Sequence, residues 1–303
     1  MKGKKIVLAL SALIAVSLIL LGLLQPQKMR PEELQDHLDS LAQGQGHIDE
    51  SGFIEDQAST LAEHLFDSSK KQNELAEELT TWYSQAKDVD VLLVYNPGGF
   101  GGAPLSQDPE WPSVMYGIQE YLEEGWGYTS VIVEHPRADY AGLGFIEAVD
   151  DIRNEYSSTA PILAAKMGFL SKYIPELRII ITGRSFGAVF ANEVMDLLPT
   201  NDRVFSVQAG RSPSYTPASE SDERTLLIEN NGTGADAWSD GDLWTIIQAN
   251  LGHVPSSSPP EEGSMQILKW YLRVPGHAYT WDFPGLQIEV IEFLKERFTG
   301  EQE

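Results

Sequence analysis

Short apolar runs alternate along the chain with longer segments in which apolar residues recur every three or four positions. This pattern predicts strands separated by helices. The expected strands are rich in β-branched residues and bounded by polar or turn residues; they cover 89–95, 130–134, 178–182, 204–208, 225–229 and 266–274. Helices are expected at 112–124, 143–156, 161–173, 188–198, 243–250 and 286–298. Such an alternation is typical of the α/β class, in which helices cover both faces of a mostly parallel sheet, here of about six strands.

The segment before the first strand, residues 29–88, carries no strand signal and is expected to be helical. Pro31 followed by two glutamates is typical of a helix start, and Gly44 and Gly46 interrupt the pattern. A second helical pattern places its apolar residues on one stripe; they are Leu61, Leu65, Phe66, Leu75, Leu79 and Trp82. We expect a stalk, or a pair of helices that packs on the following domain. A partner-binding coiled coil is the alternative.

The N-terminus predicts an association with a membrane. Lys2, Lys4 and Lys5 precede an apolar run over 6–24, which is close to the length that spans a bilayer. Polar residues and a proline follow the run, in place of a small-residue cleavage site, so we favour an uncleaved anchor over a cleaved signal peptide. Lysines ahead of the span favour a cytoplasmic N-terminus. The remainder is therefore expected outside the cytoplasm, and secreted if the segment is cleaved. The expected organisation is an anchor at 1–28, a helical segment at 29–88 and the main domain at 89–303.

Composition narrows the function classes. The chain has 45 acidic and 21 basic residues and a net charge of −24, which argues against a nucleic-acid partner because phosphates would be repelled. It contains no cysteine. Disulfides, thiolate zinc sites and a cysteine nucleophile are therefore excluded.

A glycine-serine-glycine motif separates the expected strand 178–182 from the expected helix 188–198. Residues 183–187 read Gly-Arg-Ser-Phe-Gly, with Ser185 at the centre. A serine on so sharp a corner projects beyond the sheet, and glycines two positions away on each side remove side chains that would collide as strand and helix close together. In this strand-turn-helix context the motif resembles the nucleophile elbow of the α/β-hydrolase family. The resemblance covers about 89–298 and implies a compact α/β-hydrolase fold with Ser185 as nucleophile and the N–H of Phe186 as one oxyanion donor.

A glycine-rich turn follows the first expected strand, over 96–102. In the α/β-hydrolase family this turn supplies the second oxyanion N–H, and here Gly99 and Phe100 are both candidates. The chain departs from the family at Asn96 and Pro97, where many members have His-Gly. A phosphate-binding turn is the alternative, but the chain lacks the spacing of both common phosphate-binding glycine motifs.

The family resemblance also implies a base and an acid. His277 follows the last expected strand and precedes the closing helix, which is the family's position for the catalytic histidine. Asp236, Asp240 and Asp242 follow the strand 225–229; Asp236 matches the family's acid best, and Asp242 is expected to be the N-cap of the next helix. A calcium loop would need a different spacing of its acids. The order Ser, Asp, His is that of α/β-hydrolases.

These residues predict a membrane-anchored serine hydrolase that needs no metal or organic cofactor and acts on a carboxylic ester. Residues 209–224 are too few for the cap domain that family members commonly insert there, which predicts an open site. An apolar acyl or aromatic group is expected to meet aromatic residues near the mouth, namely Phe100, Phe186, Tyr279 and Trp281. Arg184 either meets an anionic substrate or caps the helix layer, and we favour the latter. An acyltransferase or thioesterase with the same triad, and a non-enzymatic anchored interaction protein, are the alternatives.

Overall fold

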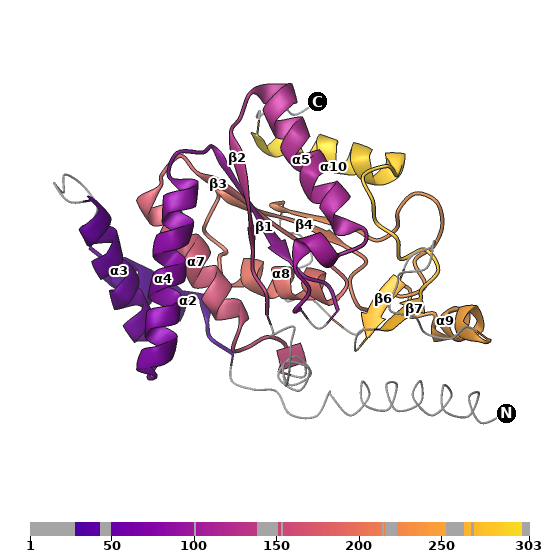
Figure 1. The fold of residues 1–303 in the computed structure, drawn as a ribbon, viewed down its shortest axis with the longest axis horizontal. Coiled ribbons are helices and arrows are strands. Elements are labelled where there is room, and N and C mark those ends of the chain that lie inside the picture. The colour runs from indigo at the N-terminus through magenta and orange to yellow at the C-terminus, as the bar shows by residue number, and fades with distance from the viewer. Residues whose placement is uncertain are drawn as a thin grey trace.

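Five parallel strands form the central sheet of this protein. The structure, a computed structural model, describes residues 28–42, 50–99, 101–137, 151–152, 154–213, 215, 223–252, 264–267 and 270–298. The strands are β1 (Val91–Asn96), β2 (Ser130–Glu134), β3 (Arg178–Arg184), β4 (Val204–Ala209) and β5 (Thr225–Ile228). Their order in the sheet is β2-β1-β3-β4-β5, and every neighbouring pair is parallel. The predicted α/β class with a parallel sheet is confirmed (Figure 1).

Helices cover both faces of this sheet (Figure 1). On one face, α5 (Trp111–Trp126) and α10 (Pro284–Phe298) form a core with the alternate strand residues Leu93 and Ile180. On the other face, α7 (Ala160–Tyr173) and α8 (Phe186–Asp196) form a second core with strand neighbours such as Leu92 and Ile179. Because successive strand side chains point to opposite faces, a strand that is buried throughout serves both cores.

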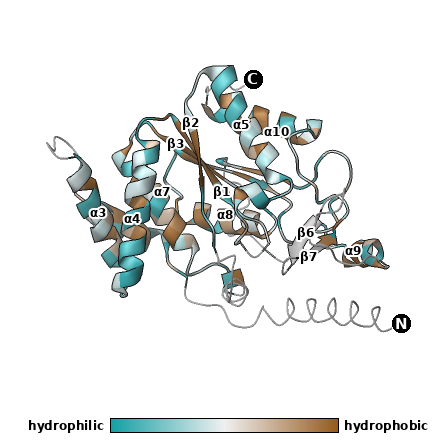
Figure 2. Cartoon of the chain, viewed as in Figure 1, coloured by the Kyte–Doolittle hydropathy of each residue, from teal (hydrophilic) through white to brown (hydrophobic). Residues whose placement is uncertain are grey.

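Three N-terminal helices form a further layer over α7. They are α2 (Pro31–Ser40), α3 (Glu50–Leu65) and α4 (Ser69–Ala86), and their apolar faces belong to the same core as α7 (Figure 2). A β-carbon at Gly168 of α7 would lie 2.3 Å from Leu38 Cδ1, so the glycine allows α2 to approach closely. The stripe predicted as one pattern is divided between α3 and α4, with residues 66–68 between the two helices.

The prediction of a single strand over 266–274 was wrong. Its residues instead contribute to two short strands, β6 (Ser264–Ile267) and β7 (Trp270–Arg273), which pair antiparallel in a separate sheet. Within the described residues the central sheet therefore has five strands, where about six were predicted. Only two residues, Leu268 and Lys269, separate β6 from β7, and neither is a glycine or asparagine that would mark a hairpin turn in the sequence.

Two predicted elements lie outside the described residues. The apolar run over 6–24 is one, and most of the helix expected at 143–156 is the other. Within the described part of the chain, no helix combines the length and apolarity needed to cross a bilayer.

Replacing Leu79 by alanine is expected to lower the free energy of unfolding by about 2–5 kcal/mol, the usual cost of a large cavity in a packed core. Leu79 is fully buried on α4, in the core that α4 shares with α7 and β3. Urea denaturation measures the change. The matched control is Leu251→Ala, at a leucine that is 57% exposed, with an expected change within about 0.5 kcal/mol. Equal stability of both variants would mean that α4 is not part of the cooperative core.

Candidate active site

A strained turn joins β3 to α8 at Ser185. The serine has φ 57° and ψ −122°, a region that non-glycine residues rarely adopt. A β-carbon at Gly183 would lie 2.4 Å from the carbonyl oxygen of Gly187, and one at Gly187 would lie 2.8 Å from the carbonyl oxygens of Asn96 and Pro97. The expectation that these glycines avoid collisions is confirmed. Gly187 makes room for the turn after β1 rather than for β3.

The Ser185 side chain is buried and its hydroxyl is unpartnered. The residue is 3% exposed, and its backbone N–H donates to the carbonyl of Ala209, at 2.9 Å. Within the described part of the chain, Ser185 Oγ has no hydrogen-bond partner. The first N–H groups of α8, beginning with that of Phe186, lie beside it at the positive end of the helix dipole.

Asp236 and His277 form a buried pair, with His277 Nδ1 2.8 Å from Asp236 Oδ2. The carboxylate also accepts a hydrogen bond from the Tyr279 hydroxyl, at 2.7 Å, and one from the Trp238 backbone N–H, at 2.8 Å. Burial alone would raise the pKa of Asp236, but the hydrogen bonds and charge of its partners, His277 first, hold this pKa below its usual value. Burial and the neighbouring Asp236 raise the pKa of Tyr279, which keeps its hydroxyl protonated as a donor.

The pair lies against Gly210, next in the chain to the residue that binds the Ser185 N–H. A β-carbon at Gly210 would lie 2.7 Å from His277 Cε1 and 2.9 Å from Asp236 Oδ2, so the pair rests directly on the backbone that follows β4. The preceding residue, Ala209, accepts the hydrogen bond from Ser185 N–H. The turns after β3, β4 and β5 therefore meet at the carboxyl edge of the sheet, where parallel α/β proteins hold their ligands.

The other two acid candidates have different surroundings. Asp240 is exposed, and its backbone N–H donates to the carbonyl of Asp236, at 2.9 Å. Asp242 caps α9 (Leu243–Asn250) by accepting from the backbone N–H of Thr245, at 3.0 Å, so its prediction as an N-cap is confirmed. Of the three aspartates, Asp236 is the one that contacts His277.

An arginine holds the glycine-rich turn that follows β1. Arg137 Nη2 donates to the carbonyl of Pro97, at 2.6 Å, and to that of Gly99, at 3.4 Å, while its backbone N–H donates to Gly101, at 2.7 Å. Gly99 has φ 54°, in the region that favours glycine. The other candidate for the second oxyanion donor, Phe100, lies outside the described residues.

Tyr156 connects this arginine to the elbow. The Arg137 guanidinium lies 5.1 Å from the ring of Tyr156 and 5.2 Å from that of Phe190 on α8, within cation–π range. The Tyr156 hydroxyl donates to the carbonyl of Phe186, at 3.2 Å. Arg137 and Tyr156 thus contact both backbone segments that are candidates for binding an oxyanion. Sequence reasoning missed both residues, which lie far from the elbow along the chain and carry no motif.

The arginine next to the nucleophile has a structural role. Arg184 is buried and forms ion pairs with Glu110 and with Asp108, the latter at 3.3 Å. Asp108 also accepts from the Trp111 backbone N–H at the start of α5, at 3.0 Å. Two carboxylates balance the charge of Arg184 at the start of a helix, as expected of a residue that supports the helix layer.

Two aromatic residues expected at the mouth are part of the framework instead. Tyr279 is fully buried behind Asp236. Trp281 packs on α5, where a β-carbon at Gly117 would lie 2.2 Å from its ring. Phe186 does lie beside the nucleophile, in an apolar cluster with Trp238 and Val274.

The remaining described histidines lie elsewhere. His37 and His64 stack on each other, with ring centroids 5.3 Å apart. His135 is buried, with Nδ1 3.4 Å from Lys166 Nζ; burial, followed by the charges of Lys166 and Arg137, holds its pKa well below the usual value. His47 and His253 lie outside the described residues.

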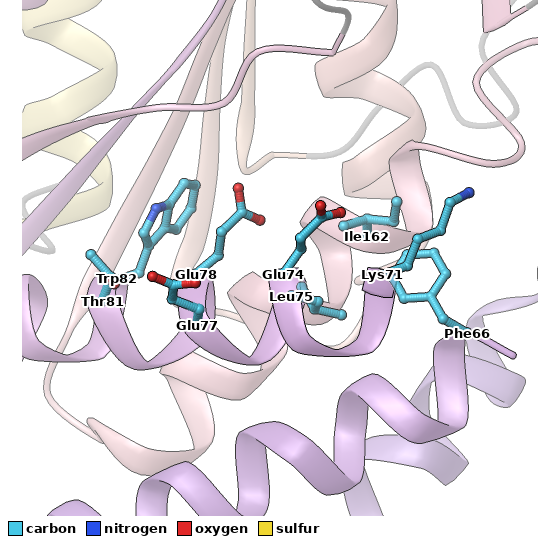
Figure 3. A pocket seen from close by; sticks show the side chains of 9 residues that line it. All are labelled: Phe66, Lys71, Glu74, Leu75, Glu77, Glu78, Thr81, Trp82 and Ile162. Atoms are coloured by element: carbon cyan, nitrogen blue, oxygen red, sulfur yellow. The ribbon is translucent and has the colours of Figure 1, made fainter. Parts of the chain in front are cut away.

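A surface hollow of about 530 Å³ lies along α4, away from this site (Figure 3). Residues of α4, together with Phe66 and Ile162, line it; those of α4 are Lys71, Glu74, Leu75, Glu77, Glu78, Thr81 and Trp82. None of the candidate catalytic residues contributes to it. Within the described residues, no three histidine or carboxylate side chains gather as a metal site would require.

In comparisons with known proteins, no protein-family model matches this sequence and no curated protein is significantly similar to it.

Replacing Gly183 by alanine is expected to lower the free energy of unfolding by about 1–3 kcal/mol, the usual cost of inserting atoms into a packed core. The new methyl group would meet backbone atoms rather than a flexible side chain. The control is Gly234→Ala, at a glycine whose β-carbon position has no atom within 4 Å. The control is expected to stay within about 0.5 kcal/mol of the parent in urea denaturation. A stable Gly183→Ala variant would contradict the close approach of β3 and α8.

Proposed function

We propose that this protein is a membrane-anchored, extracytoplasmic serine hydrolase with an α/β-hydrolase fold that cleaves carboxylic esters. The observation that carries the proposal is the buried Asp236–His277 pair, with its 2.8 Å contact, at the same edge of the sheet as a serine on a strained strand-to-helix turn. The site residues need no metal or organic cofactor for this chemistry.

The histidine acts as the base. With its Nδ1–H donated to Asp236, the neutral ring of His277 keeps Nε2 as a proton acceptor. Among the described residues no group competes for the hydroxyl of Ser185, and the attack requires that it turn toward this nitrogen. As Oγ attacks the ester carbonyl, its proton passes to Nε2; the leaving alcohol then takes that proton, and an acyl-enzyme remains. Water, activated by the same histidine, attacks the acyl-enzyme and restores Ser185.

The acid fixes and stabilises the base. Asp236 stays ionised because its pKa is below the usual value, so it favours the imidazolium that forms when His277 takes the proton. Its hydrogen bonds with Tyr279 and Trp238 restrict the carboxylate to one orientation. In this orientation the carboxylate holds the imidazole of His277 in place, as the acid of such a triad must.

The negative charge on the carbonyl oxygen is received by backbone N–H groups. Phe186, at the start of α8, provides one donor, and Gly99 or Phe100 in the turn after β1 provides the other. The acyl group lies against the apolar cluster of Phe186, Trp238 and Val274, on which Ile246 also packs. A cluster of this composition favours an apolar acyl group over a charged one.

Labelling with a fluorophosphonate probe tests the proposal. The wild type is expected to be labelled, Ser185→Ala to be unlabelled, and His277→Ala to be labelled at least about a thousandfold more slowly, because the serine is then without its base. His64→Ala, which removes an exposed histidine, is the matched control and is expected to be labelled at the wild-type rate. Labelling that persists in Ser185→Ala, or its absence in a folded wild type, would overturn the proposal. A series of p-nitrophenyl esters of increasing chain length then measures acyl preference.

Replacing Arg137 by methionine is expected to lower kcat about 10- to 100-fold with little change in KM, because the turn that carries the second oxyanion donor is no longer held. Methionine keeps apolar contact with the rings of Tyr156 and Phe190 but cannot donate to the turn carbonyls. Steady-state kinetics on a p-nitrophenyl ester measure the effect, and Arg137→Lys is expected to recover part of it.

The matched control for this variant is Arg178→Met. Arg178 also lies over two aromatic rings, those of Tyr128 and Phe298, but at the start of β3, the end of the strand remote from Ser185. The kcat of the Arg178→Met variant is expected to remain within about twofold of the wild type, because Arg178 contacts neither backbone segment proposed to bind the oxyanion. Equal losses of kcat in both variants would show that Arg137 acts through overall stability and not through the turn.

A further inference from the structure

The helix α9 turns large apolar side chains toward solvent. Leu243 is 49% exposed, Trp244 64% and Leu251, which follows the helix, 57%. Residues seven apart lie on the same side of a helix, so Trp244 and the C-cap residue Leu251 share one face. The stretch 243–251 contains no charged residue. Exposed tryptophan and leucine side chains of this kind are unusual on a surface that faces only water.

Polar contacts and one apolar contact fasten α9 to the domain from the opposite side. Ile246 packs on the cluster of Phe186, Trp238 and Val274. The Asn250 amide donates to the carbonyl of Arg273, at 2.7 Å, and accepts from its N–H, at 3.1 Å. The helix is therefore held with its apolar outer face displayed.

The described chain enters the domain at the C-terminal half of α8. The described structure begins at Lys28, whose Nζ lies 2.7 Å from Glu155 and 2.9 Å from Glu193 on α8. Burial would lower the pKa of Lys28, but the two carboxylates raise it, so the ammonium stays charged and the contact persists at neutral pH. The apolar run that is long enough to span a bilayer ends at Leu24. Three residues separate the two, so the end of the run lies at most about 14 Å from Lys28.

Contacts at the two ends of α8 connect the entry point with α9. Glu193 lies seven residues, about 10 Å, along α8 from Phe186. Phe186 packs on Trp238, with ring centroids 5.6 Å apart, and Ile246 of α9 packs on the same cluster. In Figure 1, α8 and α9 both lie below the sheet in the view, whereas α5 and α10 lie above it.

We propose that the outer face of α9, carrying Leu243, Trp244 and Leu251, docks on the surface of the lipid bilayer. This extends the membrane location in the proposed function and does not depend on catalysis. A span that ends within about 14 Å of Lys28 keeps the adjoining side of the domain at the bilayer. Tryptophan and leucine side chains bind well at the interface between headgroups and acyl chains. Because 243–251 is uncharged, docking is expected on zwitterionic lipids, where the net charge of −24 is not repelled.

Single-cysteine labelling tests this docking in the full-length chain, which has no native cysteine. The variants Trp244→Cys and Leu251→Cys are labelled with an environment-sensitive nitrobenzoxadiazole dye and reconstituted in phosphatidylcholine vesicles. Doxyl groups near the lipid headgroup are expected to quench both labels at least twofold and to shift their emission to the blue. The control is Asp202→Cys, at a side chain that is 93% exposed. Asp202 lies just before β4, at the amino end of the strands, and its label is expected to stay unquenched.

Two controls separate docking from the other parts of the proposal. Flotation of the vesicles shows whether the chain is anchored, and fluorophosphonate labelling of Ser185 shows whether the site is active. Labels at 244 and 251 that behave like the label at 202 in an anchored chain would overturn the docking and leave the hydrolase proposal standing. Energy transfer between labels on separate copies, without quenching by lipid, would assign this face to a second copy and also overturn it. A chain that fails to float would overturn both the docking and the proposed anchor.

Discussion

The buried ion pairs of Arg184 are the constraint on which the rest of the site depends. This one cation, at the end of β3, contacts Asp108 and Glu110, and through them the fixed start of α5. Asp108 also accepts from the Tyr95 hydroxyl on β1, at 3.0 Å. Removing one partner of a buried ion pair leaves an uncompensated charge, which typically costs about 3–5 kcal/mol. Two neighbouring strands and a helix are therefore held in one arrangement next to the nucleophile.

Tyr279 extends this arrangement to the base and the acid. Its backbone N–H donates to Glu110, at 3.3 Å, and its hydroxyl donates to Asp236, at 2.7 Å. The residue thus contacts both the Arg184 ion pairs and the Asp236–His277 pair, although it follows His277 by only two positions. Because each of these polar groups is buried and partnered, displacement of one would leave others unsatisfied. Hydrogen bonds and ion pairs therefore restrain the site in addition to packing.

Local sequence patterns predicted the features that depend on neighbouring residues. The strand before Ser185, the helix after it and the glycines around it follow from short-range geometry, and so does the cap at Asp242. The family resemblance favoured Asp236 among three acids because of its distance from the end of a strand, and it is the one that contacts His277.

Features that depend on distant residues could not be predicted in this way. Arg137 and Tyr156 contact the glycine-rich turn and the elbow across many residues of sequence, and nothing near either residue indicates those contacts. The contact of Tyr279 with Asp236 had a weak signal, since residues two apart in an extended segment share a side and Tyr279 stands two positions after His277. The hairpin of β6 and β7 looked like one strand because its connection lacks the usual turn residues.

The bond between Asn250 and β7 has a consequence for solubility. An exposed strand edge offers unpaired N–H and C=O groups to any other chain, and such edges favour aggregation. The side-chain amide of Asn250 offers Arg273 one donor and one acceptor, as the backbone of an adjacent strand would. At that position the outward edge of β7 is already occupied. The same asparagine that holds α9 in place therefore also limits extension of this small sheet by a foreign strand.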